Sequence, residues 1–224
     1  LHLCVGLPLH FFLLPRDATP LLTPRAVSPS AVAGAATGRS WAIWVLGGNL
    51  TLQIAIGSVV AVHLVTLLQG RGIDLDLAVT LGSLIWLAQG CGRLLQAMVG
   101  RHTHPVWEGV ASSACVFLGL VLLLASEKAV VAGALLVFGL GNGVRGIVKG
   151  TLPLVLFGAQ GYATLVGRLA LPTLVAQAAG PYLGALALDR WGATPTLIAV
   201  AALALLNLAL AYVLRAAMPA ANEA

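Results

Sequence analysis

The chain of 224 residues is dominated by apolar side chains: 59% of its residues are hydrophobic and 8% are charged, against about a quarter charged in soluble domains. So few polar side chains cannot cover a water-facing surface, which excludes a soluble globule and predicts an all-α, polytopic bundle of transmembrane helices. The net charge of +5 comes from Lys and Arg residues scattered singly along the chain. That pattern excludes nucleic acid as a partner and leaves the lipid bilayer.

Residues 1–15, LHLCVGLPLHFFLLP, are apolar but shorter than the roughly 20 residues that cross a bilayer. A secretory signal peptide would begin with basic residues and end at a small-residue cleavage site, and this stretch has neither. We therefore expect the end of a truncated transmembrane helix. Residues 16–40 mix Pro, Arg, Ser, Ala, Gly and Thr without periodicity, which predicts a cytoplasmic linker.

Residues 41–215 hold six apolar stretches separated by short polar breaks, and residues 216–224 are expected to form a cytoplasmic tail. Each stretch is close to the length that spans a hydrocarbon core of about 30 Å. The expected helices cover residues 41–69, 75–99, 106–126, 129–157, 169–188 and 194–215.

The loop charges predict an orientation, because Lys and Arg in short loops are retained on the cytoplasmic side. One set of alternate loops carries Arg16, Arg25, Arg39, Arg101, Arg168 and Arg215. The other set carries Arg71, Lys128 and Arg190. We therefore expect a multi-pass protein of the plasma (inner) membrane, with both ends of the six-helix block in the cytoplasm.

The stretch 129–157 carries cations inside an apolar span. On a helical wheel Asn142, Arg145 and Lys149 fall within about 60° of one another. A charge near the centre of a spanning helix costs about 2.5 to 3.5 kcal/mol. The stripe therefore either faces a wet interior or extends its cations to lipid headgroups. Glycines form the adjoining stripe, which suits close helix packing, at Gly139, Gly143, Gly146 and Gly150.

The stretch 41–69 has a milder polar stripe, since Asn49, Gln53 and His63 fall within about 80° on a helical wheel. His63 changes charge near neutral pH and is either a proton carrier or a neutral hydrogen-bonding group between helices. In the next stretch, Arg93 either extends to the interface or pairs with a carboxylate, of which Glu108 is the nearest by topology.

The stretch 169–188 contains Pro172 and Pro181, with Gln177 between them. Proline removes a backbone donor and bends a helix, so we expect a single helix that is bent at these prolines. Gly180 and Gly184 flank the second proline. A bent, glycine-lined helix suits the rocking motion of alternating access, and simple close packing explains the glycines equally well.

A long linker followed by six short-looped helices resembles the C-terminal half of a major facilitator superfamily transporter, with residues 1–15 matching the end of the family's sixth helix. The loop GRHTHP keeps Gly100 and Arg101 of the family's cytoplasmic G-x-x-x-D-R-x-G-R-R motif and lacks its Asp. The run that begins at Gly180 and Pro181 is similar to the family's antiporter motif G-P-x-x-G-G, with Ala185 in place of the last glycine. It lies on the equivalent of the eleventh helix rather than the fifth.

This resemblance implies a secondary transporter that works by alternating access, as importer or efflux permease, with an N-terminal six-helix half as its partner. The helices 41–69 and 129–157 would match the seventh and tenth helices, which line the substrate cavity. The predicted cavity residues are Asn49, Gln53, His63, Asn142, Arg145, Lys149 and Gln177. The predicted gating residues are Gly180, Pro181, Gly184, Arg93 and Arg101. A cationic lining favours a small anionic or strongly polar solute.

Three other classes compete with this one: an oligomeric pore, a membrane scaffold, and a non-functional fragment of a transporter. An enzyme is not expected, because the spans contain no acid–base cluster, no Ser/His pairing and no HExxH spacing. We expect no catalytic residues, cofactor or metal, since His102 and His104 alone supply too few ligands for a metal ion.

Overall fold

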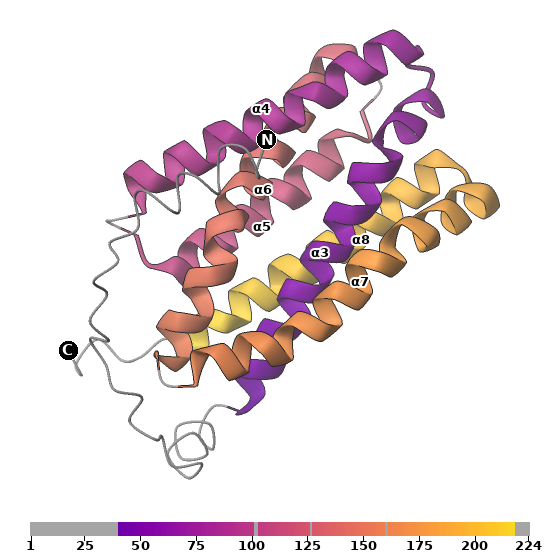
Figure 1. Ribbon diagram of the computed structural model, residues 1–224. Helices are drawn as coiled ribbons and strands as arrows, with labels where there is room; N and C mark the ends of the chain where they lie inside the picture. Colours follow the sequence, from indigo (N-terminus) through magenta and orange to yellow (C-terminus); the bar gives the residue numbers. More distant parts are fainter. Residues whose placement is uncertain (1–39, 101–102, 126, 160, 218–224) are drawn as a thin grey trace, which may run out of the picture.

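The computed structural model describes residues 40–100, 103–125, 127–159 and 161–217, and this part of the chain forms helices joined by short turns, with no strand. The long helices are α3 (Ser40–Gln69), α4 (Leu75–Val99), α5 (Pro105–Leu122), α6 (Lys128–Phe157), α7 (Tyr162–Trp191) and α8 (Ala193–Val213) (Figure 1). A short 3₁₀ helix, η2 (Leu214–Ala217), follows α8. All six long helices are long and apolar enough to cross a membrane, which confirms an all-α protein with six candidate spans.

Two helices differ from their expected boundaries. The third ends at Leu122 rather than at residue 126, and α7 covers Tyr162–Trp191 rather than 169–188. The break before α7 is short because the chain turns at Gly158 and Gly161, both at positive φ, and the polar residues that follow already belong to the helix. Pro172 and Pro181 lie inside one continuous helix, which tolerates the two missing N–H groups.

Several predicted segments lie outside the described residues. These are the truncated helix at 1–15, the linker up to residue 39, and the tail from residue 218 onward. The last linker residue, Ser40, already begins α3, and residues 216 and 217 belong to η2.

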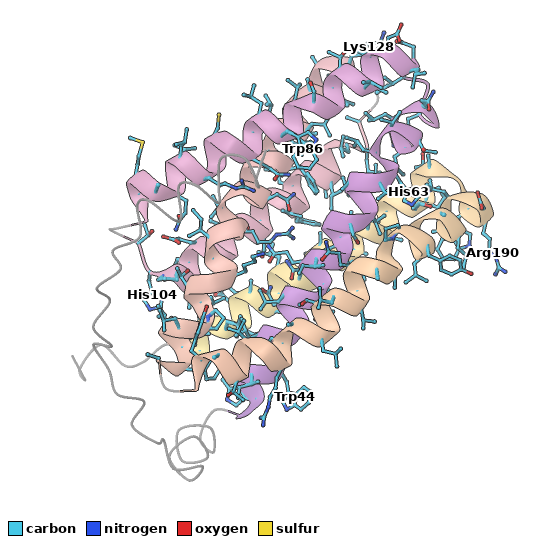
Figure 2. All side chains as sticks on the ribbon, viewed as in Figure 1. Trp44, His63, Trp86, His104, Lys128 and Arg190 are labelled. Carbon is cyan, nitrogen blue, oxygen red and sulfur yellow. The ribbon has the colours of Figure 1, made fainter. Side chains whose placement is uncertain are left out.

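The helices alternate in direction, as two apolar clusters at opposite ends of the bundle show. One cluster joins the start of α3 at Ala42 and Leu46 to the end of α6 and to η2 at Leu214 and Ala217. The other cluster joins the end of α3 to the starts of α4, α6 and α8. Trp44 and His104 lie at the first end, and Lys128 and Arg190 at the second (Figure 2). Both ends of the six-helix block therefore lie on the same side of the bundle.

The bundle consists of two three-helix groups. In one group α6 packs against both α4 and α5, and in the other α3 packs against both α7 and α8. The groups join mainly through α5 and α8. If α3, α4 and α5 are exchanged for α6, α7 and α8, these main contacts map onto one another. Because α3 and α6 run in opposite directions, the first three helices and the last three form an inverted repeat in their packing.

Glycines bring the closest pairs of helices together. A Cβ atom on Gly92 of α4 would lie 2.5 Å from the carbonyl oxygen of Leu140 on α6. In the related pair, a Cβ on Gly184 of α7 would lie 2.7 Å from His63 Cδ2 on α3. Small residues at such positions let two spanning helices pack by van der Waals contact, which replaces the hydrophobic effect in lipid.

A buried polar layer closes the side of the bundle where α5 and α8 meet. Asn49 Nδ2 donates to Asn207 Oδ1 at 2.8 Å, and Asn207 Nδ2 donates to Ser113 Oγ at 3.2 Å. Ser112 Oγ donates to the carbonyl oxygen of Gly141 at 2.8 Å. The Asn207–Ser113 hydrogen bond joins the two groups on this side, and each of the other two lies within one group. On the opposite side α3 and α4 make few contacts, and the groups diverge there.

Candidate functional site

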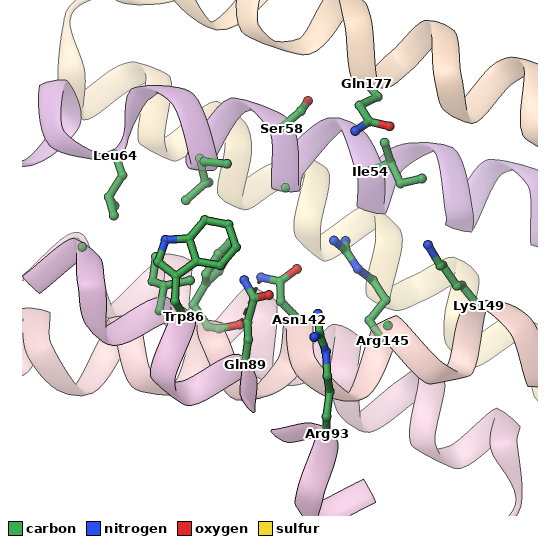
Figure 3. Close-up of a pocket in the computed structure, with 17 residues that line it drawn as sticks. Ile54, Ser58, Leu64, Trp86, Gln89, Arg93, Asn142, Arg145, Lys149 and Gln177 are labelled. Atoms are coloured by element: carbon green, nitrogen blue, oxygen red, sulfur yellow. Dashed lines mark hydrogen bonds between the residues drawn. The ribbon is translucent and has the colours of Figure 1, made fainter. Parts of the chain in front are cut away.

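A cavity of about 360 Å³ lies where the two groups diverge, between α3, α4, α6 and α7. Its lining includes the exposed side chains of Trp86, Lys149 and Gln177, so the cavity opens on one side of the bundle. Figure 3 shows side chains from α4 and α6 pointing into the space below α3. The polar lining consists of Ser58, Gln89, Arg93, Asn142, Arg145, Lys149 and Gln177.

Arg145 crosses this space and contacts α3 near its middle. Its Nη1 donates a hydrogen bond to the main-chain oxygen of Gln53, which lies near the centre of the 30-residue helix α3. At a rise of about 1.5 Å per residue, that point is about 20 Å from either end of the helix. Arg145 therefore lies near the middle of the bundle's length and faces the cavity, and an arginine side chain is too short to reach either end of the bundle from there.

The backbone of α3 makes room for this guanidinium at Gly57. A Cβ atom at this position would lie 2.9 Å from Nη2 of Arg145, closer than an unstrained contact. Every fully buried side-chain nitrogen or oxygen among the described residues has a hydrogen-bond partner. The donors of Arg145 that make no hydrogen bond therefore open onto the cavity, where they are available to a ligand.

Two further cations share the lining with Arg145. Lys149 follows it by one helical turn on α6, and Arg93 comes from α4, with Nε 3.6 Å from the position of a Cβ on Gly146. No Asp or Glu occurs among the residues that line the cavity. Three cations without an acidic neighbour in the lining of a cavity in a low-dielectric protein give a strong local positive potential, which attracts anions.

The structure places the predicted cavity residues in two different environments. Asn142 and Gln177 line the cavity together with Arg145 and Lys149. Asn49 does not line it, since it belongs to the polar layer with Asn207. The side chain of Gln53 is also buried between helices, with Nε2 3.5 Å from Ser112 Oγ, although its main-chain oxygen receives Arg145.

His63 lies between α3 and α7, away from the cavity lining. Its Nε2 is 2.7 Å from the carbonyl oxygen of Pro181. A carbonyl only accepts hydrogen bonds, so Nε2 carries the hydrogen. The predicted gating residues Gly180, Pro181 and Gly184 form the face of α7 that packs on α3. The predicted cavity residue His63 therefore contacts the predicted gating residues instead of the cavity.

The remaining predicted gating residues are not part of that contact. Arg93 lines the cavity, and Arg101 lies outside the described residues. Glu108, considered above as a partner for Arg93, instead accepts hydrogen bonds from Gln96 Nε2 at 2.8 Å and from Thr103 Oγ1 at 2.5 Å. It fastens the turn between α4 and α5 and does not neutralise the cavity.

The helix α4 forms part of the cavity lining, although none of the predicted cavity residues belongs to it and Arg93 was predicted only as a gating residue. Trp86, Gln89 and Arg93 all line the cavity, and their spacing of three and four residues places them on one helical face. A helical wheel of residues 75–99 carries this signal. Trp86 alone does not strengthen this signal, because an apolar aromatic residue in a spanning helix is equally compatible with a lipid-facing position.

Comparison with known proteins does not identify this chain, since no protein-family model matches it and no curated protein is significantly similar to it.

Proposed function

We propose that the protein is a secondary transporter, or one six-helix half of one, which moves a small anionic solute across the membrane by alternating access. The observation that carries this proposal is the mid-membrane cavity with three cations and no acidic residue in its lining. Cations inside a bilayer are costly and are found where an ion or solute passes. The charge of the site selects an anion.

The packing of the bundle supports a carrier rather than a fixed scaffold. The first three and last three helices repeat the same contacts in opposite orientation. Inverted repeats of this kind are typical of secondary transporters, in which the substrate site lies near the midplane between the repeats. The cavity has that position, since α3 and α4 come from one repeat and α6 and α7 from the other. These features are those expected of the C-terminal half of a major facilitator superfamily protein.

The open side of the cavity supports a second bundle as partner. Lys149 and Gln177 are exposed there, and polar side chains at this depth are not stable against lipid tails. We propose that a second six-helix bundle faces this side and encloses the solute between the two halves. The end that holds Trp44 and His104 would then face the cytoplasm, in agreement with the distribution of loop charges.

The test is a counterflow measurement in proteoliposomes made with the whole natural polypeptide and a panel of labelled small anions. We expect saturable uptake that is accelerated by unlabelled solute inside the vesicle. We expect Arg145→Ala and Lys149→Ala to abolish transport without loss of the folded protein, whereas Arg190→Ala, at the far end of α7, should transport normally. Flux that neither saturates nor exchanges would indicate a pore, and normal transport by the first two variants would refute the cationic site.

A further inference from the structure

The cavity has two chemically different ends. Around the cations the lining is polar, whereas the other end is formed by apolar side chains that include Leu64 of α3, Ile85 and Trp86 of α4 and Phe138 of α6. Figure 3 shows Leu64 and Trp86 at one end of the close-up and Arg145 and Lys149 at the other, with Gln89 and Asn142 between them. A site for an inorganic anion or a fully polar solute has no use for the apolar end.

Trp86 is the most informative residue of the apolar end. Tryptophan in membrane proteins gathers at the two interfaces, and Trp44, Trp107 and Trp191 follow this rule, since each lies within a few residues of a helix end. Trp86 lies midway along α4 and is nevertheless 69% exposed. Its ring lines the cavity, so it presents an aromatic surface to the cavity at a position far from either helix end.

The two ends are close enough to bind one small molecule. Phe138 and Arg145 are separated by seven residues of α6, which corresponds to about 10 Å along the helix axis. A cavity of about 360 Å³ is at the small end of the range for sites that bind small organic molecules. A single molecule can therefore place an anionic group on the cations and an apolar body against Trp86.

We propose that the solute is an amphipathic organic anion, with one anionic group bound by Arg145 and Lys149 and an apolar, ring-sized body packed against Trp86. This inference rests on the proposed transport function and narrows its substrate class. Aromatic rings favour stacked or edge-to-face contacts with tryptophan, so an aryl body suits the site. The amides of Gln89 and Asn142 lie between the two ends and can bind a polar atom in the connecting part.

The test is equilibrium dialysis of three labelled probes against the whole protein in phosphatidylcholine nanodiscs, with protein-free nanodiscs subtracted. The probes are 4-phenylbutyrate, which has both features, butyrate, which has the charge alone, and 4-phenylbutan-1-ol, which has the ring alone. Burial of a ring contributes enough free energy that we expect 4-phenylbutyrate to bind at least about tenfold more tightly than butyrate. The alcohol should bind weakly as well.

Two variants test whether the apolar end of the cavity causes the preference for 4-phenylbutyrate over butyrate. Trp86→Ala should reduce the ratio of the two anion affinities severalfold and leave the affinity for butyrate unchanged. Trp44→Ala removes a tryptophan that is 82% exposed at the end of α3, and it should leave the ratio unchanged. Adding phosphatidylglycerol to the nanodiscs should also have no effect if a free solute, rather than a lipid headgroup with its chains, occupies the site.

Each contrary result is informative. Equal binding of the two anions, or a ratio that survives Trp86→Ala, would overturn the amphipathic solute, and butyrate binding that requires Arg145 would then still support anion transport. Loss of 4-phenylbutyrate binding in proportion to phosphatidylglycerol would show that a lipid is the ligand and would also overturn it. If none of the three probes bound, both this inference and the proposed function would fail.

Discussion

Replacing Arg145 with methionine should weaken anion binding without weakening the fold. The guanidinium lies at mid-membrane depth with its Nη1 on the carbonyl oxygen of Gln53. Holding a cation at this depth costs about 2.5 to 3.5 kcal/mol, and a hydrogen bond from a charged donor returns about 1.5 to 3 kcal/mol. The balance predicts that Arg145→Met leaves the free energy of unfolding unchanged or raises it by up to about 2 kcal/mol.

The carbonyl group of Gln53 does not oppose this result. Inside a helix it also accepts the main-chain N–H of residue 57, so removal of Arg145 leaves no orphaned acceptor. Methionine is flexible and fills much of the vacated space. The variant therefore creates neither a large cavity nor an unsatisfied polar group.

Anion binding by Arg145→Met should become weaker, although the fold does not. A bound anion loses one charge-assisted hydrogen bond worth about 1.5 to 3 kcal/mol, which raises Kd about 10- to 100-fold. Equilibrium dialysis with 4-phenylbutyrate measures Kd, and thermal unfolding in detergent measures stability. Arg190→Met is the matched control, with both quantities expected at the level of the unchanged protein. An Arg145→Met protein that unfolds more readily but binds normally would show that the residue is structural, and the cationic site would be refuted.

Three further substitutions test parts of the structure. Gly57→Ala places a methyl group against the guanidinium of Arg145. This variant should raise the Kd for 4-phenylbutyrate severalfold without a change of charge. Its control is Gly133→Ala, where a Cβ meets open space, which should leave Kd unchanged and stabilise α6 by about 0.5 to 1 kcal/mol. Gly143→Ala drives a Cβ into the backbone of α4 and should lower the free energy of unfolding by about 1 to 3 kcal/mol; stability equal to that of Gly133→Ala would contradict the close packing of α4 and α6. Asn49→Ala removes a hydrogen bond of the polar layer and should cost about 0.6 to 1.7 kcal/mol of stability with no effect on Kd, and a large change in Kd would place this residue in the solute path.

Helix boundaries could be predicted where the chain carries a definite stop or start. Asp74 caps α4, because its side chain accepts a hydrogen bond from the N–H of Leu77, and Gly72 at positive φ forms the turn before it. The predicted start at residue 75 was therefore correct. The start of α7 was placed seven residues late, since a helix whose first two turns carry polar residues looks the same as a loop in the sequence.

The candidate site could be predicted only in part, because a helical wheel gives a face but not what lies opposite that face. Asn142, Arg145 and Lys149 share one face of α6, and that face borders the cavity. Asn49 and Gln53 form an equally polar face of α3, which the fold turns toward α5 and α8. Only the packing of the two three-helix groups distinguishes a polar stripe that faces the cavity from one that forms contacts between helices.

Water access to the cavity is the condition on which transport of an anion through this bundle depends, and cysteine labelling measures it. In a protein whose three cysteines are replaced by alanine, Gln177→Cys lies in the cavity lining. Val175→Cys lies at nearly the same depth on the opposite face of α7, at a position that is 60% exposed. Methanethiosulfonate reagents react with the thiolate, which forms only where water reaches it.

The expected result is that Gln177→Cys reacts with water-soluble methanethiosulfonates and Val175→Cys does not. When each rate is divided by the reagent's rate with a free thiol in water, the negatively charged sulfonatoethyl reagent should also be favoured at least about tenfold over the positively charged trimethylammonium reagent, because of the three cations in the lining. If Gln177→Cys were as unreactive as Val175→Cys, this side of the bundle would face lipid, and the proposed solute path would not exist.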